Sequence, residues 1–220
     1  MRVGTIALVI VFGLLSQLRG QNMPTRESVA ALAQQIQPTA TKSLSEFSKL
    51  VTEQNSVSMG FHDPNEVRSA TLGQPLQVFK VGLDSLRDYR TSEDPKKLLH
   101  SGDEVIYPVL LQDAARSSIT LAKVGNEWKA IAFGEPQLVK LIHGAKEKAA
   151  AKAGAEPLFI VQVPALNTVF VGYQRGGTLM LTPVVDDSRF GFKAGESIPA
   201  SDAFGKMVRA AQSQRGDAPS

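Results

Sequence analysis

Any chemistry in this 220-residue chain has to come from few reactive side chains, because it has no cysteine and only three histidines. His62, His100 and His143 do not stand at metal-ligand spacing from one another, and none belongs to an H-E-x-x-H pattern. The lack of cysteine excludes disulfides, zinc–thiolate sites, thiol redox motifs and cysteine nucleophiles. The sequence therefore assigns no catalytic, cofactor-binding or metal-binding residue, and we expect no cofactor.

Two acidic pairs could in principle perform acid–base work or hold calcium. Asp103-Glu104 precedes a predicted strand and Asp186-Asp187 follows one. The calcium-loop spacing is missing, and glycosidase carboxylates usually come from separate strands. Both pairs stand at loop positions, where acidic residues usually serve turns and solubility.

A catalytic histidine is the strongest enzymatic alternative. His62-Asp63 with Asp186-Asp187 would form a hydrolase site if their loops converged in one concave site with perturbed pKa values. No G-x-S-x-G nucleophile elbow supports this hypothesis. Asp63 is expected instead to cap a helical turn that it opens together with Pro64.

The N-terminus has the order of a secretory signal peptide, which we place at residues 1–20. Arg2 is followed by an apolar run over residues 3–15 and then by a polar segment. A membrane-spanning helix needs about 20 apolar residues, so this run is short for a span. An uncleaved anchor is the alternative because Leu18 fits a cleavage site poorly, and a buried N-terminal element is another. We expect a secreted or periplasmic protein with no integral span after cleavage.

The charge balance argues against nucleic acid as a partner. The chain has 24 basic and 21 acidic residues, and loss of the leader would remove Arg2 and Arg19. A near-neutral mature chain lacks the surplus that several phosphate contacts require. Lysines 140, 146, 148 and 152 share a predicted helix, which indicates a solvated face, with an anionic surface as the alternative partner.

Residues 21–56 have a helical pattern and form a predicted helical leader segment. Apolar residues lie in stripes on both sides of Pro38, which predicts two helices or one kinked helix, with Thr41 or Ser43 as the second N-cap. The polar face is expected to be solvated. Binding of a partner by this face is the alternative.

Residues 57–154 form a predicted α+β unit. Strands are expected at residues 76–81, 105–112, 118–124 and 127–133, with an antiparallel hairpin across Gly125-Asn126. Trp128, Ala130 and Ala132 are predicted to share one strand face, with the tryptophan against a helix. A helix beginning at Glu135-Pro136 should bury a stripe, and its Ala- and Lys-rich end should protrude as a spacer up to Gly154; the stripe comprises Leu138, Leu141, Ile142 and Ala145.

Residues 155–212 form a predicted second, smaller α+β unit, followed by a flexible tail over residues 213–220. A strand at 158–163, a hairpin across Arg175-Gly176-Gly177 and a helix at 203–211 are expected. Each unit would be an antiparallel sheet closed by an amphipathic helix. The resemblance between their orders gives a weak hypothesis of internal duplication.

These observations favour an exported, non-enzymatic α+β binding protein of chaperone-like or envelope-associated type. Its expected partner is a protein or an envelope component, with no nucleic acid. A secreted hydrolase of unfamiliar type and a structural or assembly protein are the alternatives.

Overall fold

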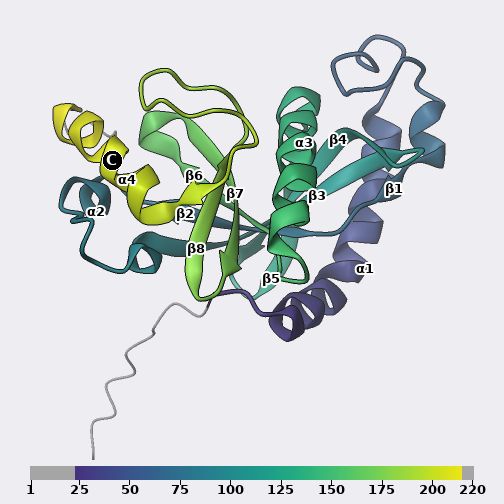
Figure 1. Ribbon diagram of the computed structural model, residues 1–220. Coiled ribbons are helices and arrows are strands. Elements are labelled where there is room, and N and C mark those ends of the chain that lie inside the picture. The colour runs from purple at the N-terminus through teal and green to yellow at the C-terminus, as the bar shows by residue number, and fades with distance from the viewer. Residues whose placement is uncertain (1–22, 215–220) are drawn as a thin grey trace, which may run out of the picture.

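The computed structural model describes residues 23–214, an α+β fold built on one open, mixed sheet (Figure 1). The predicted leader over residues 1–20 lies outside the described residues, as does most of the predicted tail. The secondary structure up to the centre of the chain comprises α1 (Arg26–Leu50), η1 (Glu66–Ser69), β1 (Thr71–Leu72), β2 (Leu76–Val81), α2 (Leu83–Arg87), η2 (Pro95–Leu98), β3 (Leu99–Leu111), β4 (Ala114–Val124) and β5 (Glu127–Gly134). It continues with α3 (Pro136–Ala153), β6 (Phe159–Val163), η3 (Pro164–Leu166), β7 (Thr168–Arg175), β8 (Thr178–Pro183), β9 (Ile198–Pro199) and α4 (Ala200–Ser213).

Eight of the nine described strands follow the order β5-β4-β3-β2-β6-β7-β8-β9, and the ninth, β1, pairs with β3 beside this path. Every pair is antiparallel, as predicted, except the central one. There β2 and β6 run parallel, with Phe79 opposite Val161. This pair joins the two predicted units into one sheet, and the arrangement does not show an internal duplication.

A single helix, α1, replaces the predicted pair of N-terminal helices and contains Pro38. It begins with a capping box, in which the Ser28 amide donates to Thr25 Oγ1 and the Thr25 amide donates to Ser28 Oγ. Proline removes one helical hydrogen bond, and the axis of α1 changes direction along its length (Figure 1). The predicted second caps are wrong because the helix does not restart. Thr41 and Ser43 lie inside it, and Ser43 Oγ donates to the Thr39 carbonyl at 2.8 Å.

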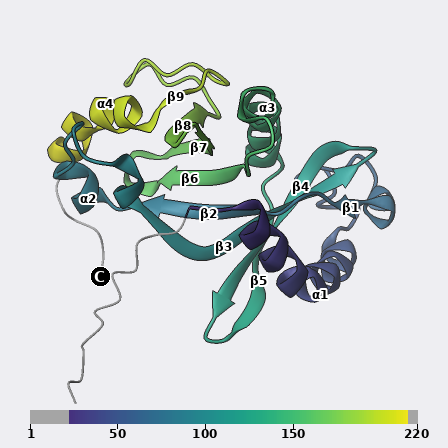
Figure 2. The same ribbon diagram turned by 60° about the horizontal axis from the view of Figure 1, so that its bottom comes forward.

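Helices cover the two faces of the sheet differently (Figure 2). Ile106 and Ile160 belong to the cluster beneath α3, whereas their chain neighbours point to the opposite face. There Val105 packs with α1 at one end of the sheet, and Val161 packs with α4 at the other. Because successive strand residues point to opposite faces, α3 covers one face and α1 and α4 share the other.

The Ala-rich end of α3 does not protrude, contrary to the sequence prediction. Ala149 is fully buried and Ala145 nearly so, in the same cluster as residues of β6 and β7. Alanine side chains let the helix approach the sheet closely enough to fill this space. The buried stripe is also rotated from the predicted one, since Val139 is buried and Leu141 is 42% exposed.

The β4–β5 hairpin forms across Gly125-Asn126 as predicted, with Gly125 at φ +65°. A bulge changes its far end, where Leu121 pairs with Ala130 and Thr120 pairs with Ala132. Ile131 is the extra residue of the bulge, so Ala132 does not continue the face of Trp128. Phe133 takes that place, stacked on Phe47 of α1 at a centroid distance of 5.7 Å. The predicted packing of Trp128 on the helix side is confirmed.

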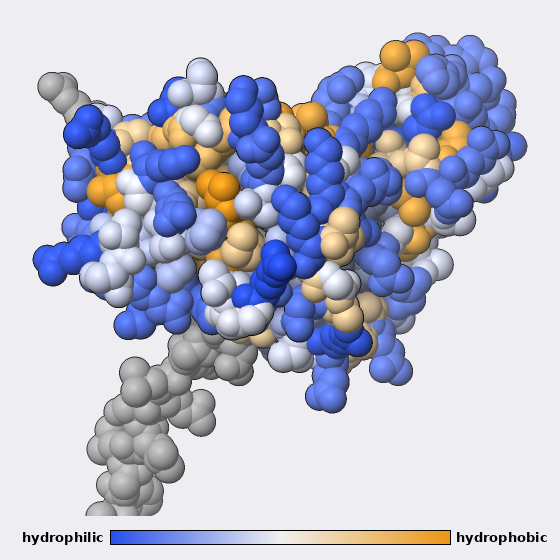
Figure 3. Space-filling view, in the orientation of Figure 1, coloured by the Kyte–Doolittle hydropathy of each residue, from blue (hydrophilic) through white to orange (hydrophobic). Residues whose placement is uncertain are grey.

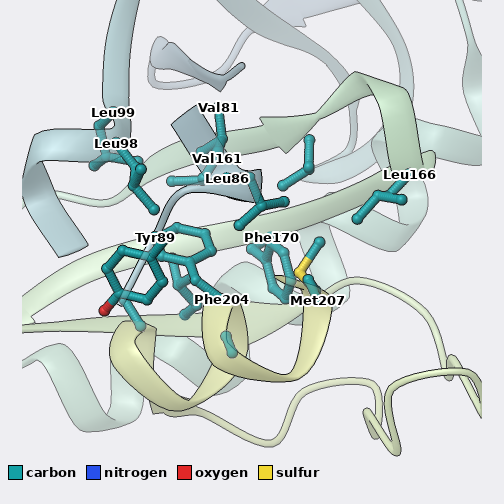
Figure 4. Packing of buried hydrophobic residues seen from close by; sticks show 14 of the residues in the cluster. Val81, Leu86, Tyr89, Leu98, Leu99, Val161, Leu166, Phe170, Phe204 and Met207 are labelled. Carbon is teal, nitrogen blue, oxygen red and sulfur yellow. The ribbon is translucent and has the colours of Figure 1, made fainter. Parts of the chain in front are cut away.

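The C-terminal part of the sheet contains the most aromatic cluster of the described residues. Phe204 and Met207 point from α4 toward Phe170 and neighbouring side chains (Figure 4). Tyr89, which follows α2, meets Phe204 edge to face at 6.0 Å. The amphipathic helix predicted at residues 203–211 therefore buries its apolar face, and it starts three residues earlier, at Ala200.

Candidate functional site

The residues of the hydrolase hypothesis lie in two separate loops. His62 and Asp63 follow α1; the His62 amide donates to Glu66 Oε2 at 2.8 Å, and Asp63 Oδ1 accepts from the Asn65 amide. The helical turn expected to begin at Asp63-Pro64 starts later, at Glu66. Asp186 and Asp187 follow β8, and α3 stands between the two loops (Figure 1). Within residues 23–214, no hydrogen bond or ion pair joins the two pairs.

Asp186 and Asp187 organise their own loop. The Arg189 guanidinium donates to Asp187 Oδ2 at 2.6 Å, and this hydrogen bond holds the pKa of Asp187 below its ordinary value. The Ala194 amide donates to Asp186 Oδ1 at 2.8 Å and is the main cause of the lowered pKa of Asp186, with a smaller effect from Lys193. Lowered pKa values keep both carboxylates ionised, which suits turn stabilisation better than proton donation.

The other singled-out polar residues also have structural neighbours. Glu104 pairs with Lys80 at 2.6 Å, while Asp103 adopts a left-handed conformation with φ 44°. Burial lowers the pKa of Lys146 on α3. Across the part of the chain that the structure describes, no three His, Asp or Glu residues are grouped as metal ligands would be. The helices within residues 23–214 include none with the length and apolarity to cross a bilayer.

A groove between α1 and β5 is the first of two candidate binding sites. Its volume is about 380 Å³, and it is lined by Thr39, Lys42, Ser43 and Glu46 from α1 and by Glu127, Trp128, Lys129, Ala130 and Phe133 from β5. Two features of the fold bring these residues together. The β4–β5 hairpin turns Trp128 and Ala130 to one face, and the second half of α1 lies on that face.

The backbone of β5 adds unpaired hydrogen-bonding groups to the side of this groove. Within the described residues, β5 pairs only with β4 and so forms one edge of the sheet. A two-residue turn makes Val124 and Glu127 the first hydrogen-bonded pair of the hairpin. The alternation of an antiparallel ladder then places Trp128 and Ala130 in non-bonded pairs, so their N–H and C=O groups point away from β4. Those outward groups stand beside the groove.

The charges around the groove are paired. Lys42 Nζ lies 3.7 Å from Glu46 Oε1 on α1, and Lys129 Nζ lies 3.2 Å from Glu127 Oε2 on β5. The lining therefore carries two positive and two negative groups with no surplus of either sign. An apolar floor with paired charges at its sides suits an uncharged, extended segment.

A cleft between the β3–β4 turn and α3 is the second candidate site, with a volume of about 600 Å³. Its lining residues are Gln112, Asp113, Ala114, Ala115, Arg116, Lys140, His143 and Glu147. His143 Nε2 lies 3.4 Å from Glu147 Oε1, one helical turn along α3. Arg116 and Lys140 make no ion pair within residues 23–214.

Neither site could be found from spacing along the chain. The groove requires knowing that β5 lies at a sheet edge, which depends on strand order rather than on the sequence of β5. The one local signal was the tryptophan in a hairpin, which the sequence does place against a helix. The cleft joins residues 112–116 to residues 140–147 through the packing of α3 on the sheet. A search of family models, curated proteins and solved structures found no match to this chain.

Proposed function

We propose that this protein is an exported, non-enzymatic binding protein that takes an extended polypeptide segment of a partner into the groove between α1 and β5. The segment would add to the sheet as a strand next to β5. The observation that carries the proposal is the pair of outward backbone groups at Trp128 and Ala130, which border a groove lined by a tryptophan. Strand addition uses such groups for affinity and side-chain pockets for selectivity.

The partner chemistry follows from the lining. Strand residues alternate between faces, so every second side chain of a docked segment would enter the groove beside Trp128 and Ala130. Small apolar or hydroxyl-bearing side chains fit there because the lining charges already have partners. Next to the strand, the segment would also pass the exposed Glu127 and Lys129 side chains at the side of the groove.

Exposed strand edges are normally protected against uncontrolled pairing, and β5 has such protection. The bulge at Ile131 distorts its second half, and Lys129 places a charge on its outer face. The regular part of the edge is therefore short. A short edge favours selective, reversible docking of one segment, which agrees with the chaperone-like or envelope-associated role expected from the sequence.

A proline substitution tests strand addition directly. Immobilised protein would select binders from a random-peptide phage library, and fluorescence polarisation would measure the affinity of the selected peptides. Ala130→Pro removes an outward N–H while leaving the ladder to β4 intact, and it should weaken binding about tenfold. Ala130→Ser keeps both the amide and the side-chain size and should bind within about twofold of the unmodified protein.

Two further measurements separate docking from loss of structure. Bound peptide should slow hydrogen exchange at the amides of Trp128 and Ala130. Thr39→Trp should block the groove from the helix side without changing the strand. The proposal is wrong if selected peptides protect amides elsewhere, or if a folded Ala130→Pro variant binds them as well as the unmodified protein does.

A further inference from the structure

The cleft between the β3–β4 turn and α3 lies beside a two-residue hairpin turn and a β-bulge. Gln112 and Asp113 both adopt left-handed conformations, with φ 51° and 63°. Next to this turn, Leu110 pairs with Ala115 and Val109 pairs with Ser117, which leaves Arg116 as the extra residue of a bulge. Left-handed conformation at both central residues is normal for a two-residue hairpin turn of type I′, whereas the bulge redirects a side chain, and bulges are common next to active sites.

One guanidinium nitrogen of the bulge residue has no hydrogen-bond partner in the part of the chain that the structure describes. Arg116 Nε is buried and makes no hydrogen bond within the described residues. A buried N–H donor without an acceptor costs about 1–3 kcal/mol. Arg116 also lines the cleft, so a negatively charged oxygen bound there would meet its guanidinium group.

The neighbouring charges define what such an oxygen should belong to. Lys140 supplies a second cation on the same cleft, and His143 is already engaged by Glu147. Asp113 and Glu147 would repel a group carrying two negative charges. A cleft of about 600 Å³ lies within the range of small-molecule sites. A planar, singly charged carboxylate matches the fork of an arginine better than a doubly charged phosphate would beside two acids.

We infer that this cleft binds the carboxylate of a small molecule, with Arg116 and Lys140 as its cationic contacts. The site shares no residue with the groove between α1 and β5, and it does not depend on the proposed function. Gly60 packs directly against the backbone of the Arg116 bulge. A Cβ at Gly60 would lie 1.9 Å from the Arg116 carbonyl oxygen. Only glycine lets the loop after α1 pack so closely against the bulge.

The test uses benzoate as the probe and benzamide as its neutral match, with inorganic phosphate as the competing anion. Each would be titrated into the ¹⁵N-labelled full chain while the Arg116 Nε–H signal is followed by NMR. Benzoate should move this signal with saturation, and benzamide should leave it in place. Arg116→Gln should weaken benzoate binding about tenfold or more, because it removes a charge-assisted hydrogen bond.

Lys140→Gln is the second variant. Lys140 is exposed on α3, so this substitution should leave the fold unchanged. It should weaken binding severalfold, and Lys152→Gln on the same helix but outside the cleft should not. The inference fails if benzoate gives no saturable shift, if benzamide binds equally well, or if phosphate binds more tightly than benzoate. It also fails if folded Lys140→Gln keeps full affinity.

Discussion

The two halves of the sheet differ in how many of their buried side-chain N and O atoms have a hydrogen-bond partner. In the N-terminal half, formed by α1 and β1–β5, the Tyr107 hydroxyl, Arg116 Nε and Ser117 Oγ are buried with no hydrogen-bond partner in the described chain. The C-terminal half, formed by β6–β9 and α4, has one such atom, the Tyr173 hydroxyl. The groove lies in the N-terminal half, and the cleft lies between that half and α3.

The C-terminal half contains the more aromatic core of the described residues. Its aromatic side chains pack with one another under α4, and its long loop is held by Asp186 and Asp187 (Figure 4). On the face that carries α3, apolar residues are scattered among hydrophilic ones (Figure 3). Binding elements are commonly drawn from the less stable parts of a protein and supported by its stable parts. We therefore expect stability and binding to be separable by mutation between the halves.

The largest effect should come from matched truncations of phenylalanine. Phe204 is fully buried, so Phe204→Ala should lower the free energy of unfolding by about 3–5 kcal/mol. Phe133 is only partly buried, and Phe133→Ala should cost about 2 kcal/mol or less. Urea unfolding would measure both. Equal costs would show that the C-terminal half is not the more stable of the two.

Alanine substitutions at two glycines should lower the free energy of unfolding by intermediate amounts, more at Gly60 than at Gly191. Gly60→Ala combines φ +97° with a clash against the Arg116 carbonyl and should cost about 3 kcal/mol. Gly191 also has positive φ, but no atom lies within 4 Å of an added Cβ, so Gly191→Ala should cost about 1 kcal/mol. Thermal unfolding gives the two costs. Benzoate titration of Gly60→Ala should also show weaker binding, and unchanged binding would separate Gly60 from the cleft.

The smallest effects should have opposite signs. Burial raises the pKa of Tyr107 to about 12, and its hydroxyl has no partner in the described chain. Tyr107→Phe should therefore be neutral or stabilise the protein by about 1 kcal/mol. Thr182 Oγ1 and Ser197 Oγ share a hydrogen bond of 2.8 Å. Thr182→Val removes it and should lower the free energy of unfolding of the protein by about 1 kcal/mol. Chemical denaturation of both variants checks the signs, and destabilisation by Tyr107→Phe would mean that its hydroxyl has an acceptor.

Local patterns predicted most of the strands and two of the three two-residue hairpin turns in the described residues, because alternation and turn residues act over a few positions; the turn at Gln112-Asp113 was not predicted. They placed Gly125-Asn126 and Gly176-Gly177 correctly in hairpins. They failed where tertiary packing decides, as in the burial of Ala149 and the face of Ala132. The helix break predicted at Pro38 was wrong for a related reason. The packing of α1 on β3 and β4 keeps the helix continuous despite one lost hydrogen bond.

The site residues were harder to predict than the elements. Trp128 was identified as a packing residue, but the open edge beside it follows from strand order. Arg116 had no sequence signal, because a bulge shows only when both paired strands are known. His62 and Asp186 were grouped because their residue types suit catalysis, and the fold keeps each with neighbours in its own loop.

The parallel pairing of β2 with β6 has a consequence for synthesis of the chain. Val78 meets Ile160 across this pair, although the whole β3–β4–β5 meander and α3 separate them in sequence. Local hairpins can form as soon as they leave the ribosome, but contacts between distant segments form late and slow the folding of a domain. The nascent protein should therefore carry an unpaired β2 edge until residue 163 emerges, and a delay in translation before that point would prolong its exposure to wrong partners.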